Sequence, residues 1–306
     1  PTDQSGTLMH WVLQMALDPH PGPDNPCAAL QPYLELDDEA MAALAGLLVD
    51  EYAKRFLPED TARFAYLLSR LKKSMTGLLC YLRDEQNQSR FRPVACELKI
   101  GSGADAVPGQ LYHLSDGRTV QLVGTVDRAD EWVEENGTRW VRVVDYKTGT
   151  KKLDLKEVYC GLDCQMLLYL FALKKEGKQR FGMDIEPAGV LYLPARDEIL
   201  SAERNITPEQ LQSQREKELR RTGLLLCEPE VLQAMEHEAL QSPRFLPVRV
   251  NREGDVSGAL ASADQLGRLG QYVERLLHQI AREVRDGNID ADPCCHNEDG
   301  SVCKYC

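Results

Sequence analysis

The chain has 306 residues, of which 43% are hydrophobic and 27% charged, and its formal net charge at pH 7 is −12. This length allows one large domain or two small ones with a buried core. The sequence contains no run of 18 apolar residues and no signal peptide, so we expect no membrane partner. Because proteins that bind nucleic acids are usually basic where they touch phosphate, the acidic balance weighs mildly against DNA, although divalent cations bound at acidic groups would offset it.

Three helices are predicted in the first 85 residues. The first covers residues 6–17, with Ser5 as a possible N-cap. The second, 38–56, has acidic side chains in its first turn and basic ones near its end, which suits the helix dipole. The third, 59–85, carries apolar residues at helical spacing.

The pattern then changes to strands. Four segments rich in β-forming residues are predicted as strands: 92–101, 110–115, 119–133 and 138–149. The turn sequences Ser-Asp-Gly at 115–117 and Glu-Asn-Gly at 135–137 separate them, and the second predicts a hairpin. A long helix at 155–178 and a short apolar strand at 188–194 follow. This order predicts an α/β fold with a mixed sheet.

Beyond residue 196 the chain turns polar, and we expect it to be helical. Residues 210–223 are strongly charged and predict a solvated face, whereas 263–287 predict a long amphipathic helix ending at Gly287, a natural C-cap. We therefore expect one domain with three parts: a core over about 1–195, a helical extension over about 196–290 and a cysteine-rich tail over 294–306.

Two aspartates follow apolar runs in the predicted hairpin. Asp127 ends the run LVGTVD and Asp145 ends WVRVVD, so the antiparallel strands can bring both carboxylates to one edge of the sheet. Lys147, two residues after Asp145, lies on the same face. Two carboxylates can hold one or two Mg²⁺ ions, and a lysine beside them can orient water and stabilise charge during phosphodiester hydrolysis. Taken alone, however, an Asp-x-Lys at a strand end is usually an exposed turn.

Further residues support a metal site. Gln165 and Tyr169 form an i,i+4 pair on one face of the following helix. His10, four residues after Gly6 in the first helix, can add an imidazole ligand, the alternative being a packed core histidine. Glu97 in the first strand is a weaker candidate, because a surface or salt-bridged glutamate explains it as well.

Four segments resemble, in order and rough spacing, the RecB-type nuclease domain of the PD-(D/E)xK superfamily: GTLMH (6–10), GTVDRAD (124–130), VDYKTG (144–149) and QMLLY (165–169). The chain is most similar to the AddB family, the B subunits of bacterial ATP-dependent AddAB helicase–nucleases. RTGLLL (221–226) and DGNIDADP (286–293) extend this resemblance over nearly the whole chain. It implies a restriction-endonuclease-like α/β core, with a central mixed sheet flanked by helices and added helical segments.

The resemblance also implies a site. The Mg²⁺ ligands would be His10, Asp127, Asp145 and the backbone carbonyl of Tyr146. Lys147 would be the catalytic lysine, and Gln165 and Tyr169 would support the site or contact DNA. The implied substrate is single-stranded DNA, the strand with the 5′ end, unwound in the bacterial cytoplasm during double-strand-break repair. Because no ATP-binding Gly-x-x-x-x-Gly-Lys-Ser/Thr occurs in the chain, an AddA-like helicase–nuclease partner is implied as well.

Four of the ten cysteines fall in the last 13 residues: Cys294, Cys295, Cys303 and Cys306. Without a secretory signal, metal or cluster ligation is favoured over disulfides. Proteins of the AddB family hold a [4Fe–4S] cluster, and Cys303-x-x-Cys306 resembles two of its four ligands. We expect the other two ligands to lie outside this sequence, and the cluster to be incomplete here. Cys294 and Cys295 are expected to be spare thiols, with substitute ligation or adventitious Zn²⁺ binding as alternatives.

Two other functions stay open. A stand-alone RecB-type iron–sulfur exonuclease shares the motifs but leaves the segment 196–260 unexplained. A degenerate domain that only binds DNA or acts as a scaffold requires a broken catalytic set, whereas Asp127, Asp145 and Lys147 are all present.

Overall fold

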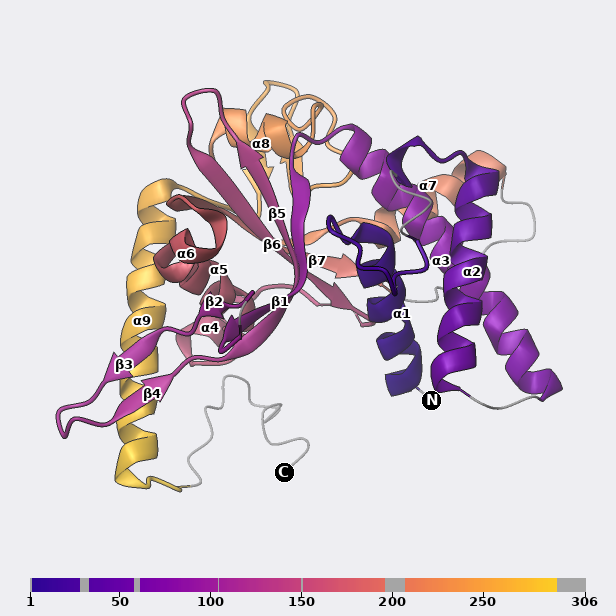
Figure 1. Cartoon of the computed structure of the whole chain (residues 1–306). Helices are drawn as coiled ribbons and strands as arrows, with labels where there is room; N and C mark the ends of the chain where they lie inside the picture. Colours follow the sequence, from indigo (N-terminus) through magenta and orange to yellow (C-terminus); the bar gives the residue numbers. More distant parts are fainter. Residues whose placement is uncertain are drawn as a thin grey trace.

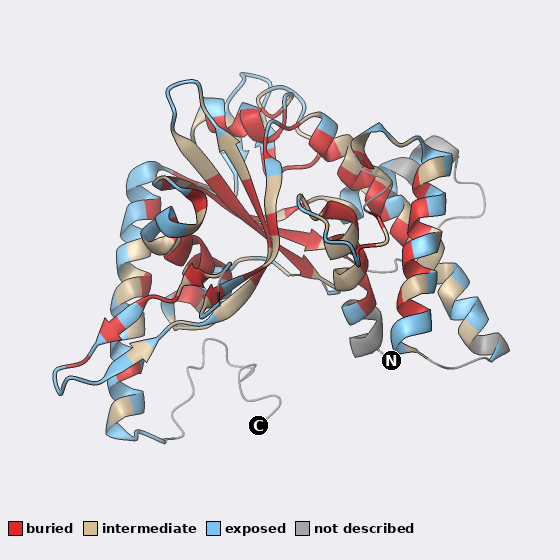
Figure 2. Ribbon diagram, viewed as in Figure 1, coloured by how far each residue is buried: buried red, intermediate tan, exposed pale blue. Residues whose placement is uncertain are grey.

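A mixed seven-stranded sheet forms the centre of the fold in the computed structural model, which describes residues 2–27, 33–57, 61–103, 105–149, 151–195 and 207–290. In sheet order its strands are β11 (Leu260–Ala261), β8 (Thr222–Leu226), β7 (Ile185–Pro194), β6 (Arg139–Lys147), β5 (Gly124–Val133), β1 (Arg92–Gly101) and β2 (Val107–Pro108). The middle strands are largely buried (Figure 2). The predicted α/β fold with a central mixed sheet is therefore confirmed. The cysteines at 294–306 lie outside the described residues.

The hairpin of β5 and β6 is the element that the sequence marks most clearly. Its strands pair in antiparallel register, and Gly137 in the connecting turn has φ 89°, a conformation that glycine adopts without steric cost. β6 pairs on its other side with β7 in parallel register, which makes the sheet mixed. The predicted hairpin is confirmed.

The sheet separates two groups of helices (Figure 1). One group consists of α1 (Thr2–Leu17), α2 (Asp38–Phe56) and α3 (Ala62–Asn87), and α1 packs against β1 and β5. The other consists of α5 (Gln165–Glu176), α6 (Lys178–Phe181) and α9 (Ala263–Asp286), and α5 packs against β6 and β7. Ser5 lies inside α1 and is not its N-cap, because the helix begins earlier than predicted, at Thr2.

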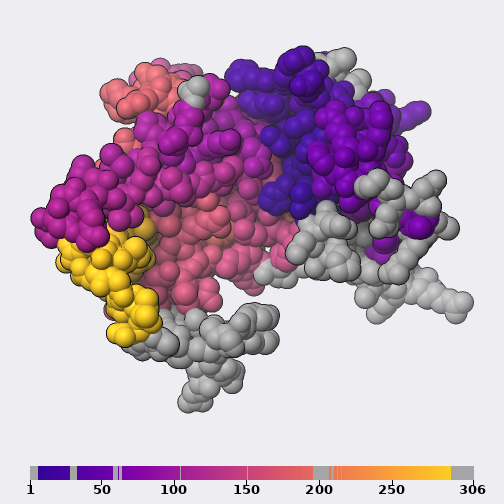
Figure 3. Space-filling model, turned by 60° about the horizontal axis from the view of Figure 1, so that its bottom comes forward, coloured from indigo at the N-terminus to yellow at the C-terminus, as the bar shows by residue number. Residues whose placement is uncertain are grey.

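Two predicted segments are divided in the structure. The helix expected at 155–178 is divided into α4 (Leu155–Tyr159), α5 and α6. Gly161 and Asp163, with positive φ values of 81° and 52°, separate α4 from α5, and Gly177 separates α5 from α6. The strand expected at 119–133 is β4 (Thr119–Gln121) followed by β5. β4 pairs with β3 (Leu111–His113) in a separate hairpin that lies along α9 (Figure 3).

The expectation of a wholly helical extension after residue 196 is wrong. α7 (Pro208–Leu219) leads into β8, whose leucines at 224–226 are buried in the central sheet. The short helix α8 (Pro229–Met235) and a hairpin of β9 (Val248–Val250) and β10 (Val256–Gly258) follow. α9 ends, as predicted, at Gly287 with φ 67°. None of the helices in the described ranges has the length and apolar character that crossing a membrane requires.

Candidate metal-dependent active site

Asp127 lies where β5 and β6 cease to pair. The last recorded pair of this ladder joins Arg128 to Val144, and extending the register by one residue places Asp127 opposite Asp145. The backbone N–H of Tyr146 donates a hydrogen bond to Oδ2 of Asp127 at 2.8 Å. This bond fixes the carboxylate at the opening between the two strands.

His10 reaches this opening from α1. The helix approaches β6 closely, since a Cβ on Gly6 would lie 3.2 Å from the Thr148 side chain. Nδ1 of His10 lies 3.6 Å from Oδ2 of Asp127, and Nε2 donates to the carbonyl oxygen of Tyr146 at 3.1 Å. The imidazole side chain is 33% exposed, so it is not a packed core histidine.

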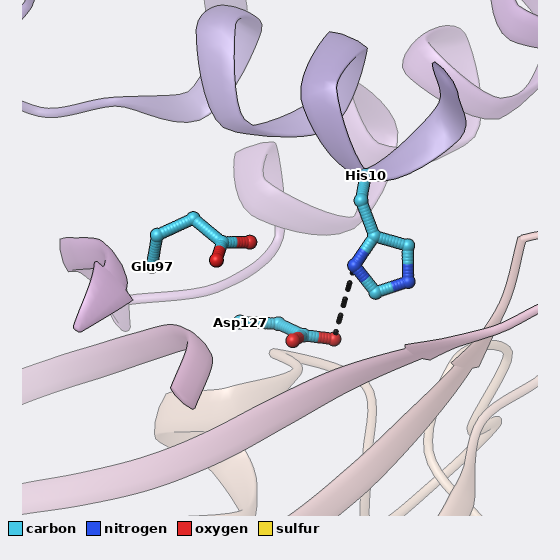
Figure 4. A group of neighbouring side chains, drawn as sticks. All are labelled: His10, Glu97 and Asp127. Carbon is cyan, nitrogen blue, oxygen red and sulfur yellow. Dashed lines mark ion pairs between the residues drawn. The ribbon is translucent and has the colours of Figure 1, made fainter. Parts of the chain in front are cut away.

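Glu97 completes a group of three potential metal ligands. The ligand atoms of His10, Glu97 and Asp127 all lie within 4.8 Å of one another, and Figure 4 shows the three side chains converging from α1, β1 and β5. Burial raises the pKa of Glu97, the negative charge of Asp127 raises it further, and His10 opposes the shift. Glu97 also has φ 50°, a strained conformation for a residue with a side chain. The structure thus brings Glu97, the weaker candidate from the sequence, together with His10 and Asp127.

Asp145 and Lys147 lie beside this group. Nζ of Lys147 is 2.6 Å from Oδ2 of Asp145, whose side chain is 7% exposed. Burial raises the pKa of Asp145, as does the nearby Asp127, while Lys147 and His10 lower it. Of the predicted ligand set, the structure therefore brings together His10, Asp127 and the Tyr146 carbonyl, and directs Asp145 to the lysine.

Gln165 and Tyr169 lie at the start of α5. Nε2 of Gln165 donates to the Tyr169 hydroxyl at 3.2 Å. Tyr169 is buried and lies directly against Gly124 at the start of β5, the strand that carries Asp127. Tyr169 thus supports the strand, whereas Gln165 is exposed to solvent.

A buried ionic network lies next to the site and was not foreseen from the sequence. Asp130 lies 2.8 Å from Arg128 and 2.9 Å from Arg142, and all three side chains are fully buried. Burial alone would raise the pKa of Asp130, but the two guanidinium groups outweigh it and hold the pKa below its usual value. The guanidinium of Arg128 also lies 5.9 Å from the ring centroid of Tyr146, so the network contacts the site.

The network extends to more distant parts of the chain. Glu85 of α3 lies 3.7 Å from Arg142 and forms an ion pair with Arg221, which precedes β8. Burial opposes ionisation of Glu85, but Arg221 and Arg142 together keep its pKa below the usual value. These pairs connect α3 and the segment before β8 to the strands that carry the site.

Comparisons with known proteins agree with this architecture. The model of the PD-(D/E)XK nuclease superfamily matches residues 1–306. The B subunit of an ATP-dependent helicase/deoxyribonuclease from Ruminiclostridium cellulolyticum is 33% identical over 284 residues, which cover 89% of this chain and 24% of that protein. The protein of the same name from Clostridium tetani is 29% identical over 310 residues, which cover 100% of this chain and 26% of that protein. The chain thus spans about a quarter of the length of these curated relatives.

Proposed function

Since the chain belongs to the PD-(D/E)XK nuclease superfamily, we propose that it is the nuclease domain of an AddAB-type helicase–nuclease and hydrolyses phosphodiester bonds of single-stranded DNA with Mg²⁺. The observation that carries this proposal is the convergence of His10, Glu97 and Asp127 beside the Asp145–Lys147 pair. Three acidic groups and a lysine at one opening of a sheet are the residues that metal-assisted hydrolysis needs.

The donor set fits a divalent cation. Glu97, Asp127 and the Tyr146 carbonyl offer the oxygen ligands that Mg²⁺ prefers, and His10 offers a nitrogen that also suits Mn²⁺. When bound, the cation would polarise the phosphate and lower the pKa of the attacking water. Without it, burial and the neighbouring charge of Asp127 both disfavour the ionised form of Glu97 and raise its pKa.

Lys147 and Asp145 act on the reacting groups in this proposal. The ammonium of Lys147 orients the attacking water and stabilises the negative charge that develops on the phosphate. Asp145 holds that ammonium in place through the 2.6 Å contact. Gln165 and Tyr169 keep α5 against the start of β5, so that Asp127 stays at the opening.

The test is degradation of single-stranded DNA by the full-length protein with its partner subunit, with Mg²⁺ and with excess EDTA. Asp145→Ala and Lys147→Ala are expected to reduce the cleavage rate by about 100-fold or more, comparable to the loss of a charge-stabilising group. Lys174→Ala is the matched control, because Lys174 forms an ion pair with Glu186 on the exposed surface. Cleavage that needs no metal, or that both site variants retain, would contradict the proposal.

The biological setting follows from the same proposal. The relatives are named as B subunits of a helicase/deoxyribonuclease, so we expect an AddA-like partner to supply unwound strands during double-strand-break repair in the bacterial cytoplasm. The cleaved strand would be the one with the 5′ end. Co-purification of the full-length protein with such a partner, and end-labelling of either strand, test these two points.

We further propose that Cys303 and Cys306 bind a [4Fe–4S] cluster in the full-length protein. The spacing Cys-x-x-Cys is typical of such ligands. Iron and sulfide analysis of the full-length protein and of its Cys303→Ser/Cys306→Ser variant tests this, and equal iron content in both proteins would contradict it.

A further inference from the structure

A groove of about 550 Å³ runs along β1 away from the candidate metal site. Residues 94–99 of β1 form one wall, so Glu97 belongs both to the metal-ligand group and to the groove. β2 pairs only with Ile100 and Gly101, which leaves this stretch of the β1 edge without a neighbouring strand among the described residues. The groove and the candidate metal site therefore share Glu97.

Two cationic side chains line this groove. Lys99 lies on β1 two residues beyond Glu97, and Arg180 lies on α6. Within the ranges that the structure describes, neither side chain has an ion pair or a hydrogen bond, and Nε of Arg180 is buried without a partner. An unpaired buried N–H is costly, and an anion bound to this guanidinium, which lies 5.9 Å from the ring centroid of Phe181, would offset part of that cost.

The lysines of α5 and α6, unlike Lys99 and Arg180, form ion pairs with carboxylates. Lys174 and Lys175 on α5 and Lys178 on α6 lie 2.9, 2.7 and 2.8 Å from carboxylate oxygens. Of the basic residues on α5 and α6, Arg180 is thus the one without a carboxylate partner in the described structure. Lys99 also has no such partner within the described part of the chain, and both residues line the same groove.

The groove is not uniformly basic, because Asp18 and Asp105 also line it. Oδ1 of Asp18 accepts the backbone N–H of His20, which partly satisfies that carboxylate. Because acidic and basic side chains both line the groove, we expect it to bind individual phosphates through single contacts. A wholly basic surface would instead attract a polyanion over its whole area.

We propose that this groove holds the single DNA strand on one side of the scissile phosphate, and that Lys99 and Arg180 each bind a backbone phosphate there. The inference rests on the proposed nuclease function and deepens it. Recognition is of the sugar–phosphate backbone, so it is independent of base sequence. A peptide strand added to the open edge of β1 is the competing occupant that the experiment tests.

The experiment uses the full-length protein with its partner and single-stranded oligonucleotides that carry one methylphosphonate, walked across the cleaved linkage. For the wild type, neutralising each of the two bound phosphates should lower kcat/KM about tenfold, the value of one charge-assisted hydrogen bond. Lys99→Gln and Arg180→Gln should cleave the unmodified strand about tenfold less efficiently. Each variant should then cleave equally well with or without a methylphosphonate at the one phosphate that its missing side chain binds. That phosphate should differ between Lys99→Gln and Arg180→Gln.

Binding measured in Ca²⁺ gives a second readout that does not depend on turnover. For each glutamine variant, the slope of log K against log salt should fall by about 0.7, the value for one phosphate on a single strand. Arg180→Lys should keep most of the slope, and Lys178→Gln on the same helix should match the wild type.

The two levels of failure are distinguishable. If Lys99→Gln and Arg180→Gln cleave and bind like Lys178→Gln, with the wild-type pattern of methylphosphonate sensitivity, the groove does not hold the strand, and a peptide becomes its better occupant. If the wild-type complex cleaves no single-stranded DNA at all, the proposed function fails and this inference fails with it.

Discussion

A single added methyl group at Gly124 is expected to disturb the contact between β5 and α5. A Cβ there would lie 2.6 Å from both Cε1 and the hydroxyl oxygen of Tyr169, where ordinary contacts begin at 3.4 Å. Because the Tyr169 ring is buried, the ring or the strand has to move by most of an ångström. Overpacking of this kind costs about 1–3 kcal/mol, so Gly124→Ala should lower the free energy of unfolding by that amount. Cleavage should fall too, since Asp127 lies on the same strand, close to Gly124.

The assay is urea denaturation of the wild type, Gly124→Ala, Tyr169→Ala and the double variant. Tyr169→Ala removes the ring that the methyl group meets, so adding Gly124→Ala in that background should cost close to nothing. The coupling energy between the two changes then equals the whole effect of the single glycine substitution. Gly22→Ala is the control, because a Cβ at Gly22 meets nothing within 4 Å. A Gly124→Ala loss that is the same in both backgrounds, or no loss at all, would refute the reasoning.

Two further predictions concern charges. Asp130→Asn should destabilise the fold by about 3–5 kcal/mol, because it leaves two buried guanidinium groups without their carboxylate. The control is Lys174→Gln, which breaks an exposed ion pair and should lower the free energy of unfolding by under about 1 kcal/mol in calorimetry. Similar losses for Asp130→Asn and Lys174→Gln would count against a stabilising role for the buried ionic network. Because the pKa of Glu97 is raised, protons should compete with Mg²⁺ at a higher pH than for an ordinary glutamate of pKa about 4.3. Titration calorimetry should therefore show that the affinity for Mg²⁺ declines as the pH falls towards that raised pKa. Glu97→Gln should bind Mg²⁺ more weakly, and its affinity should depend less on pH. If the affinities of the wild type and Glu97→Gln are the same at every pH, Glu97 is not a ligand.

Local sequence alone predicts that three residues of the candidate site lie near one another. Asp127, Asp145 and Lys147 fall within one hairpin, and alternation of side chains together with the Glu-Asn-Gly turn places them near one another. Glu97 depends instead on the register of β1 against β5, in which it stands between the pairs Cys96–Arg128 and Leu98–Val126. That register is long-range, and one residue of slip would move every side chain to the other face.

The leucines at 224–226 show a second limit. A short apolar run fits a buried strand or a buried helix equally well, because periodicity does not separate the two. What decides is the exposed edge of β7, which β8 covers in antiparallel register. Gly223 lies against the Val190 carbonyl so closely that no Cβ fits, and its φ is 146°. Both facts belong to the assembled sheet and are absent from the local sequence.

The buried arginines show a third limit of prediction from the sequence. Arginine is almost never fully buried unless paired, so Arg128, Arg142 and Arg221 look like surface residues in the sequence. Their partners, Asp130 and Glu85, are buried with them, and these five charges contribute little to the field at the surface.

A cation bound to Glu97 and Asp127 would cancel two negative charges at the opening itself. The local balance along the β1 groove then depends on Lys99 and Arg180, which have no ion pair in the described structure, against Asp18 and Asp105. A strand that follows this groove would therefore meet a field different from the one that −12 suggests. In the proposed binding mode, the metal ion and these two cations would hold the strand beside the scissile phosphate.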